Sequence, residues 1–402
     1  MFEIIDRDAN DTIIKVIGVG GAGGNAVEHM IRAGVGGVEF ICCNTDAQAL
    51  KHSSAGAKLQ LGPGLGAGGR PERARTHAQA DREKIADLLR GANMCFITAG
   101  MGGGTGTGAA PIIAEVARDL GILTVAVVTK PFAFEGRRAK VAEEGLAELA
   151  QNVDSLIVIL NEKLMEVLGE DISMLEAFKA ADNVLKNAVG GISEIINVPG
   201  LVNVDFEDVR TVMGEMGKAM MGSAGAAGVD RARLAAEQAV ASPLLEGIEL
   251  SGAKGVLVNI TASSSLGLKE YQEVMNTIHT YTAPDATVIC GAVFDDEMED
   301  QLRVTVVATG LGNKAKSQPK LVYGEGRGQR TGTYDLPPAA ALSAPPATGV
   351  MDIAGGNAAA GSLDDFFTPN PRGGARDGRA RDMSNIGLND IDIPAFLRRQ
   401  AD

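Results

Sequence analysis

Residues 99–108 read AGMGGGTGTG and stand between an apolar run, Met94–Thr98, and a helical pattern that begins near Ala109. Six of these ten residues are glycine. Glycine loses more conformational freedom on folding than any other residue, so a turn alone explains the run poorly. Successive backbone N–H groups in such a loop form a concave anion site, and the hydroxyls of Thr105 and Thr107 can donate to phosphate oxygens. The run therefore predicts a phosphate-binding loop.

A second glycine cluster, GVGGAGGN at residues 18–25, also follows an apolar run and precedes a helical pattern. Gly18, Gly20 and Gly23 match G-x-G-x-x-G, in which glycines let the backbone approach a phosphate at a helix N-terminus. Alone the match is weak, because a tight strand-to-helix turn without a ligand has the same glycines. Two such loops at the carboxyl ends of parallel strands predict a di- or triphosphate ligand.

Short β-branched runs alternate with helical patterns over the first 160 residues, as is typical of a parallel sheet covered on both faces. We expect strands over 13–19, 38–43, 94–98, 122–128 and 156–160, and helices over 25–32, 71–90 and 109–120. A long helix with one apolar face is expected over 173–197, followed by strands near 255–261, 286–293 and 302–308 and helices near 231–241 and 268–281.

These patterns predict an α/β fold with five parts. We expect a doubly wound parallel-sheet nucleotide-binding domain over 1–172, a long central helix with an acidic loop over 173–216, a smaller α+β domain over 217–312, a disordered linker over 313–385 and a C-terminal peptide over 386–402. The linker is expected to be disordered because it is rich in Ala, Gly, Pro and Ser and has almost no periodicity.

Composition excludes several classes of protein. The 402 residues carry a net charge of −14, which argues against a nucleic-acid groove or an anionic membrane surface as the main partner. No apolar run approaches the roughly 20 residues that span a bilayer, so we expect no membrane insertion. The first residues have no signal-peptide form, and four scattered cysteines do not make a disulfide framework or a zinc site. A cytoplasmic protein is expected.

Two kinds of nucleotide protein fit less well. The P-loop pattern G-x-x-x-x-G-K-[ST] is absent; its nearest approach, at Gly217-Lys218, lacks both the first glycine and the hydroxyl residue. An NAD-type dehydrogenase needs an acid at the end of the second strand for the ribose, but that strand ends in Cys43-Asn44. It also leaves the loop at 99–108 unexplained.

The residues at 102–108 are similar to the signature of the tubulin/FtsZ superfamily, and further stretches resemble the bacterial FtsZ family. These stretches are Val19–Gly21, Asn44–Gln48, Thr129–Phe132, Asn203–Arg210, Ser242–Leu245 and the tail Asp392–Arg399. The resemblance covers about residues 1–312 and the tail, and leaves out only the linker. It implies a GTP-binding, GTP-hydrolysing protein that assembles with itself into filaments of the division ring at mid-cell.

The resemblance also implies which residues bind GTP or GDP. The matching positions for the phosphates are Gly20, Gly21, Ala22, Gly23, Gly24, Gly102, Gly103, Gly104, Thr105, Gly106 and Thr107, with Ala67, Gly68 and Gly69 near the γ-phosphate. Asn25 and Asn44 are further expected nucleotide-binding positions. Glu135 matches the acid that contacts the ribose, Asn161 and Asp182 match positions that recognise guanine, and Phe178 matches the ring that stacks on the base. From spacing alone, Phe178 fits a core position and Asp182 a solvated charge equally well.

An acidic loop carries the implied catalytic residues. Asn203, Asp205 and Asp208 match the loop that the family inserts into the next subunit, where two carboxylates can orient water or a cation. Hydrolysis also requires Mg²⁺, with K⁺ as a further possible cation, and the chain has no P-loop lysine to neutralise phosphate charge. From spacing alone, Asp205 fits a helix cap as well.

Two departures from the family pattern lie near the implied nucleotide. The family usually has Arg four residues after the ribose acid, whereas Arg138 follows Glu135 by three. The segment 61–66 is a few residues shorter than usual, and Arg70 stands where the family often has Asn. They leave open a nucleotide-binding regulator that does not turn over.

The tail pairs Ile391, Ile393, Phe396 and Leu397 with Arg398 and Arg399. A short apolar motif after a flexible tether is how peptide ligands reach partner grooves, although a frayed end has the same composition. The resemblance implies that residues 392–399 bind membrane-tethering and regulatory division proteins such as FtsA.

Overall fold

The computed structural model describes residues 12–169, 172–198, 200, 202, 204–215, 217–242 and 252–311. Asn203, the expected linker and the expected tail peptide lie outside these residues. None of the described helices is long and apolar enough to cross a membrane.

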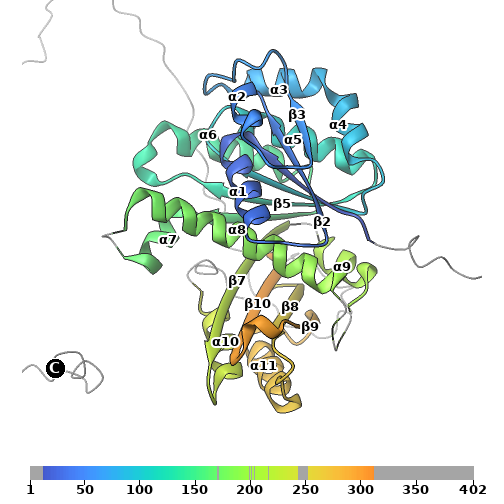
Figure 1. The fold of residues 1–402 in the computed structure, drawn as a ribbon, viewed down its shortest axis with the longest axis vertical. Coiled ribbons are helices and arrows are strands. Elements are labelled where there is room, and N and C mark those ends of the chain that lie inside the picture. Colours follow the sequence, from blue (N-terminus) through green and yellow to red (C-terminus); the bar gives the residue numbers. More distant parts are fainter. Residues whose placement is uncertain are drawn as a thin grey trace, which may run out of the picture. The chain divides into compact units, whose positions relative to one another are not determined.

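Ten strands form one sheet in the order β3-β2-β1-β4-β5-β6-β7-β10-β8-β9 (Figure 1). Their bounds are β1 Ile14–Val19, β2 Val38–Asn44, β3 Ala57–Gln60, β4 Met94–Gly100, β5 Leu123–Lys130, β6 Ser155–Leu160, β7 Gly217–Ala227, β8 Gly255–Ala262, β9 Thr287–Phe294 and β10 Gln301–Leu311. The strands from β3 to β7 pair in parallel, whereas β10 is antiparallel to both β7 and β8. The expected α/β fold is confirmed.

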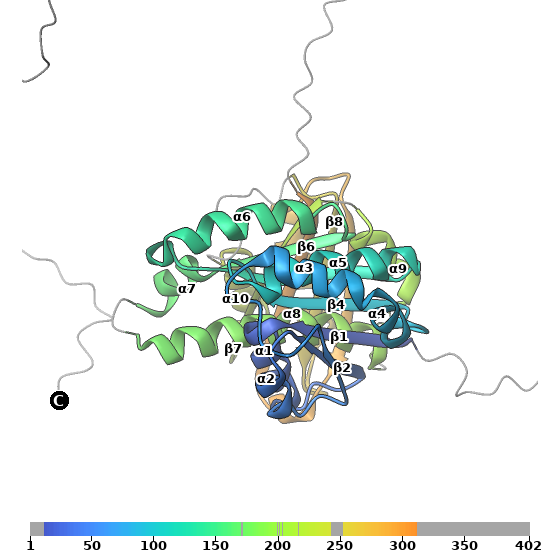
Figure 2. The ribbon, with the colours of Figure 1, turned by 90° about the horizontal axis from the view of Figure 1, so that it is seen from above.

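Helices cover both faces of the first six strands. Their bounds are α1 Gly20–Arg32, α2 Ala47–Lys51, α3 Pro71–Ala80, α4 Arg82–Leu89, α5 Thr105–Asp119, α6 Arg137–Leu149 and α7 Asn161–Leu168. Successive side chains of β1 point to opposite faces, so Ile14 and Val16 pack with α1 while Ile17 and Val19 pack with α3 and α5. Figure 2 shows α1 and α2 on one side of the sheet and α3, α5 and α6 on the other.

The long helix α8, Met174–Asn197, lies between the sheet's two halves (Figure 1). It begins after Ser173, whose hydroxyl accepts a hydrogen bond from the Glu176 N–H at 3.3 Å. Its buried face, which includes Leu185, Val189 and Ile192, joins the core under β4 to β6. Beyond it follow α9 Phe206–Met213, α10 Arg231–Val240 and α11 Leu268–Tyr281; α10 and α11 pack on β8 and β10 in a separate core.

Several expected boundaries were wrong. The expected helix over 71–90 is two helices that break at Asp81, whose carboxylate accepts from the Gly62 N–H at 3.1 Å. The helices α1 and α5 begin at Gly20 and Thr105, earlier than expected, because the glycine runs form their first turns. Strand β7 escaped sequence analysis because its Gly- and Ala-rich sequence, GKAMMGSAGAA, has little apolar alternation.

Candidate nucleotide-binding site

The two glycine loops lie side by side because β1 and β4, the strands before them, are neighbours. Val19 pairs with Ala99 at the ends of these strands. Helix α1 begins directly after β1 and α5 begins a short turn after β4, and neither helix has a side-chain cap or an acid in its first turn. Their first backbone N–H groups therefore point at one place and attract an anion there.

The glycines of these loops serve two purposes. Gly20 has a φ of +76°, and a Cβ there would lie 2.9 Å from the backbone nitrogen of Gly106. A Cβ at Gly23 would collide with the carbonyl oxygen of Thr98. These glycines let the two loops pack together. Gly21 and Gly24 face open space, which leaves the backbone accessible to a ligand.

Three threonines fix the shape of the loops. The hydroxyls of Thr45 and Thr105 are 2.6 Å apart, which ties the end of β2 to the start of α5. Thr107 is buried, and its hydroxyl accepts from the Gly102 N–H at 2.9 Å. The sequence predicted phosphate contacts for Thr105 and Thr107; in the structure both hydroxyls brace the loops. Thr45 was not predicted, although it stands in the stretch 44–48.

The third expected loop packs against the second. Gly68 and Gly69 adopt positive φ angles of +62° and +69°. A Cβ at Gly104 would lie 2.9 Å from the Ala67 Cβ and 3.2 Å from the Gly69 nitrogen. All three glycine-rich segments therefore meet beside the N-terminus of α5.

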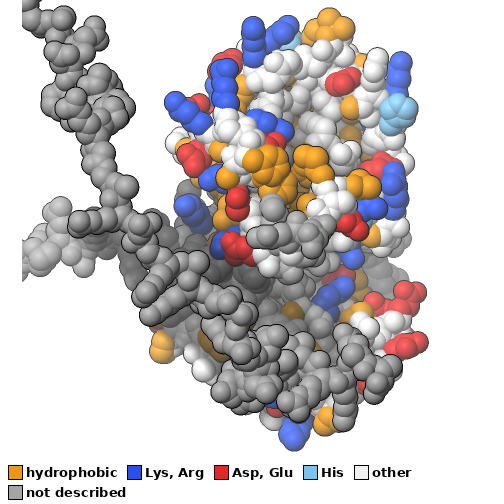
Figure 3. Space-filling model, turned by 90° about the vertical axis from the view of Figure 1, so that its left-hand side faces the viewer, with side chains coloured by type: hydrophobic (Ala, Val, Ile, Leu, Met, Phe, Trp, Pro, Cys, Tyr) orange, Lys and Arg blue, Asp and Glu red, His pale blue; other side chains and the backbone are white. Residues whose placement is uncertain are grey.

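A cavity of about 350 Å³ opens beside the loops. Its lining includes the expected residues Gly21, Ala22, Asn25, Glu135, Arg138, Asn161, Phe178 and Asp182, and also Gly100, Met101, Thr129, Pro131, Ala181 and Leu185, which sequence analysis did not single out. Figure 3 looks onto this side of the molecule and shows hydrophobic side chains gathered around a hollow.

One end of the cavity is suited to a flat, polar ring. Asn161 is only 5% exposed, and its Oδ1 atom has no hydrogen-bond partner among the residues that the structure describes. Asp182 is half-buried, and burial raises the pKa of its carboxyl to about 6. Phe178 is 42% exposed and meets Phe132 edge-on, with ring centroids 6.0 Å apart. Phe178 is therefore not a core residue, and Asp182 is not a fully solvated charge.

Glu135 and Arg138 stand together at the wall of the cavity. The Arg138 Nη1 donates to Glu135 Oε2 at 2.5 Å, and the Phe132 N–H donates to Glu135 Oε1 at 3.0 Å. Arg138 Nε also donates to the Gly102 carbonyl at 3.4 Å. Arg138 thus lies across the second glycine loop despite its displaced position in the sequence.

The acidic loop lies far from the glycine loops. Asp205 caps α9, because its Oδ1 accepts from the Asp208 N–H at 2.8 Å. Both side chains are exposed. Helix α8, whose 24 residues span about 36 Å, has Asp182 in its first half and ends just before this loop. The structure therefore does not bring Asp205 and Asp208 to the cavity of their own chain (Figure 1).

Comparison with known families identifies this arrangement. Residues 13–169 match the model of the tubulin/FtsZ family GTPase domain, and residues 217–312 match that of the FtsZ family C-terminal domain. The chain belongs to the FtsZ family. It therefore carries this family's GTPase domain, and the dehydrogenase alternative is wrong.

Relatives of this FtsZ-family chain match along all or most of its length. The cell division protein FtsZ of Pseudomonas aeruginosa is 53% identical over 411 residues, which covers 100% of both chains. The cell division protein FtsZ of Coxiella burnetii is 58% identical over 320 residues, 78% of this chain and 83% of that one. A solved FtsZ dimer from M. jannaschii superposes with a TM-score of 0.72 at 42% identity, covering 76% of this chain and 89% of that one.

Proposed function

We propose that the chain is a GTPase of bacterial cell division that binds GTP in the cavity beside its glycine loops and hydrolyses it between neighbouring subunits of a head-to-tail filament. One observation carries the proposal. The N-termini of α1 and α5 lie side by side at one end of a cavity whose other end offers an unpartnered Asn161 carbonyl oxygen and the Asp182 carboxylate. Phosphates fit the first end and a guanine ring the second.

Guanine recognition follows from the chemistry of that end. The ring nitrogen and exocyclic amine of guanine donate hydrogen bonds, and Asp182 and Asn161 Oδ1 can accept them. A ligand that supplies such donors offsets the cost of leaving buried polar atoms unpaired. The exposed face of Phe178 packs against the ring. Glu135 binds the ribose hydroxyls, and Arg138, released from Glu135, then turns to the phosphates.

Hydrolysis needs little covalent chemistry from the protein. The oxygen of water forms a bond to the γ-phosphorus, the bond to the bridging β-γ oxygen breaks, and GDP and phosphate result. The N–H groups of the glycine loops stabilise the negative charge that develops on the phosphates. Asn203, Asp205 and Asp208 of the adjacent subunit orient the attacking water.

Mg²⁺, when bound, neutralises charge on the phosphate oxygens, and K⁺ is a further candidate cation. Within the described residues no group of three or more His, Cys, Asp or Glu side chains is arranged to hold a metal ion. This fits Mg²⁺ held chiefly by the nucleotide's phosphates, which is how proteins commonly bind it.

The proposal extends to partners and place. Filaments of this chain form the ring at mid-cell, and residues 392–399 tether them to the membrane by binding FtsA or another division protein. The apolar and basic composition of that peptide supports this role. A pull-down of FtsA by the free peptide, with Phe396→Ala as the failing variant, tests it.

The decisive experiment measures GTP-dependent phosphate release against protein concentration, with Mg²⁺ and K⁺ present. A site shared between subunits predicts a threshold concentration below which release vanishes. Release per molecule that does not change with concentration would remove Asp205 and Asp208 from the mechanism. No release at any concentration would favour the non-hydrolysing regulator.

A further inference from the structure

A second and larger cavity, of about 530 Å³, lies between α3 and α6. Its lining includes Gly68, Gly69 and Gly102, so it begins where the second and third glycine loops meet. Arg138 lines this cavity and the nucleotide cavity alike. The two spaces therefore adjoin, and the side chain of Arg138 stands at their shared wall.

The end of this cavity nearest the loops is strongly basic. Arg70 and Arg137 line it, and Arg73 lies 3.8 Å from the position that a Cβ on Gly68 would take. Across the part of the chain that the structure describes, the side chains of these three arginines have no hydrogen-bond or ion-pair partner. Three unpaired guanidinium groups in a chain of net charge −14 attract a soluble anion.

Acidic side chains do not cancel this charge. Glu72 lies at the loop end, whereas Glu144 and Glu148 lie two and three turns along α6. Glu148 forms an ion pair with Arg75, whose buried Nε still has no partner. The cavity is thus basic beside the loops and mixed in charge farther away.

The start of α6 adds a second, independent reason for an anion. Arg137 and Arg138 occupy its first turn, which contains no acid, and Gly136 provides no side-chain cap. Cations at a helix N-terminus are unfavourable because the helix dipole is positive there. An anion bound at this point would offset both charges and accept hydrogen bonds from the uncapped N–H groups.

We propose that this cavity is a phosphate subsite next to the γ-phosphate position, lined by Arg70 and Arg137, with Arg73 near Gly68 at its edge, and separated from the nucleotide by Arg138. The inference rests on the proposed GTPase function, because it places the loops' ligand phosphates beside the cavity. The ligand is a phosphate dianion, the free phosphate that hydrolysis releases. Free phosphate would then leave through the cavity between α3 and α6.

The test titrates inorganic phosphate into the GDP-loaded full-length chain, below the concentration at which it assembles, and follows binding by phosphorus-31 NMR. We expect saturable binding that Arg137→Gln weakens about tenfold, the loss of one charge-assisted hydrogen bond. Lys140→Gln is the matched control, because it removes the same charge from α6 at a residue that does not line the cavity. Equal phosphate affinity in the two variants would overturn the subsite.

Three further readings separate the remaining possibilities. Loading with a non-hydrolysable GTP analogue tests whether the subsite is separate from the nucleotide: free phosphate still binds if it is, and exclusion of phosphate by the γ-phosphoryl group would overturn the proposal. If Arg137→Gln raises the assembly threshold and leaves phosphate affinity unchanged, the arginines contact the next subunit and the proposal is wrong. Affinity for a fluorescent GDP analogue, measured on the same samples, tests the nucleotide site by itself; GDP binding without phosphate binding refutes only this inference.

Discussion

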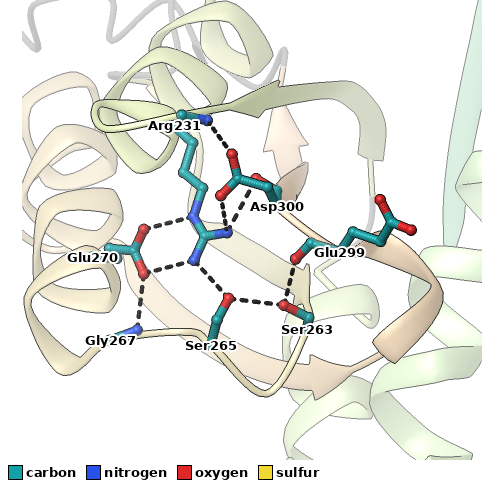
Figure 4. Close-up of polar contacts among 8 residues, drawn as sticks. Arg231, Ser263, Ser265, Gly267, Glu270, Glu299 and Asp300 are labelled. Atoms are coloured by element: carbon teal, nitrogen blue, oxygen red, sulfur yellow. Dashed lines mark hydrogen bonds and ion pairs between the residues drawn. The ribbon is translucent and has the colours of Figure 1, made fainter.

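The nucleotide cavity and a polar cluster in the second domain, residues 217–312, differ in whether their buried polar atoms are paired. In the second domain, Arg231 donates to both carboxylate oxygens of Glu270, at 2.6 and 3.0 Å, and to Ser265 and Asp300 (Figure 4). In the cavity, Asn161 Oδ1 has no hydrogen-bond partner within the described ranges.

The difference distinguishes structural from functional polar groups. Arg231 is 5% exposed, and its cluster joins the starts of α10 and α11 to the turn before β10, so its hydrogen bonds hold the second domain together. The cavity keeps unpaired acceptors and uncapped helix ends, which cost stability until a ligand pairs with them. Loss of a residue should therefore damage folding in the Arg231 cluster and ligand binding in the nucleotide cavity.

The acidic loop gives the largest expected effect. The carboxylate of Asp208 has no partner within the described part of its own chain, as expected for the proposed contact with an adjacent subunit. Asp208→Asn should abolish turnover, a loss of 100-fold or more for a group that orients the attacking water, and leave GTP affinity unchanged. Phosphate release and fluorescent-GTP binding measure the two quantities; turnover equal to that of the unmodified chain would contradict the in-trans role.

Arg231→Met should give the next largest effect, which is a loss of stability and not of ligand binding. Removing one partner of a mostly buried ion pair leaves the Glu270 charge uncompensated and costs about 3 kcal/mol of unfolding free energy. Urea unfolding followed by circular dichroism measures this cost. Arg233→Met is the control, because Arg233 is 45% exposed and its ion pairs contribute about 1 kcal/mol or less. An equally large loss for Arg233→Met, or a loss of GTP affinity in folded Arg231→Met, would break the distinction between the two regions.

Sequence alone could locate the cavity because its signals are local. Runs of glycine between strand and helix patterns indicated the loops that lie at one end of the cavity, and the alternation of strands and helices indicated the doubly wound sheet. Sequence could not separate Gly20, which packs against Gly106, from Gly21, which faces open space, because that depends on contacts between loops. Strand β7 and the break at Asp81 were missed for the same reason: distant partners determine both.

A smaller effect is expected at the base end of the cavity. Asn161→Ala removes an acceptor that has no partner in the described part of the chain, so it should weaken GTP binding roughly tenfold and cost little stability. Titration with a fluorescent GTP analogue and urea unfolding of the empty protein measure the two effects. Asn152→Ala is a useful control, because the Asn152 amide donates to the Glu148 carbonyl outside the cavity, at 3.1 Å. Loss of stability without loss of affinity in Asn161→Ala would assign Asn161 to the fold.

The smallest effect concerns pH. Burial raises the pKa of Asp182 to about 6, partly opposed by nearby His29. The folded empty protein therefore holds a proton on Asp182 that the unfolded chain, with an ordinary Asp pKa, has already released between about pH 4 and 6. The contribution of Asp182 to stability is consequently largest at low pH and falls as pH rises through that window. Asp182→Asn should remove this slope and slightly stabilise the empty protein at pH 7.

GTP binding should show the reverse trend, because only ionised Asp182 accepts both guanine donors, so affinity should fall as pH drops below 6. Urea midpoints and fluorescent-GTP affinities between pH 4.5 and 7.5 test both trends. Identical pH profiles for Asp182→Asn and the unmodified chain would remove Asp182 from the base site. Asp182 would then be a structural residue, as Arg231 is.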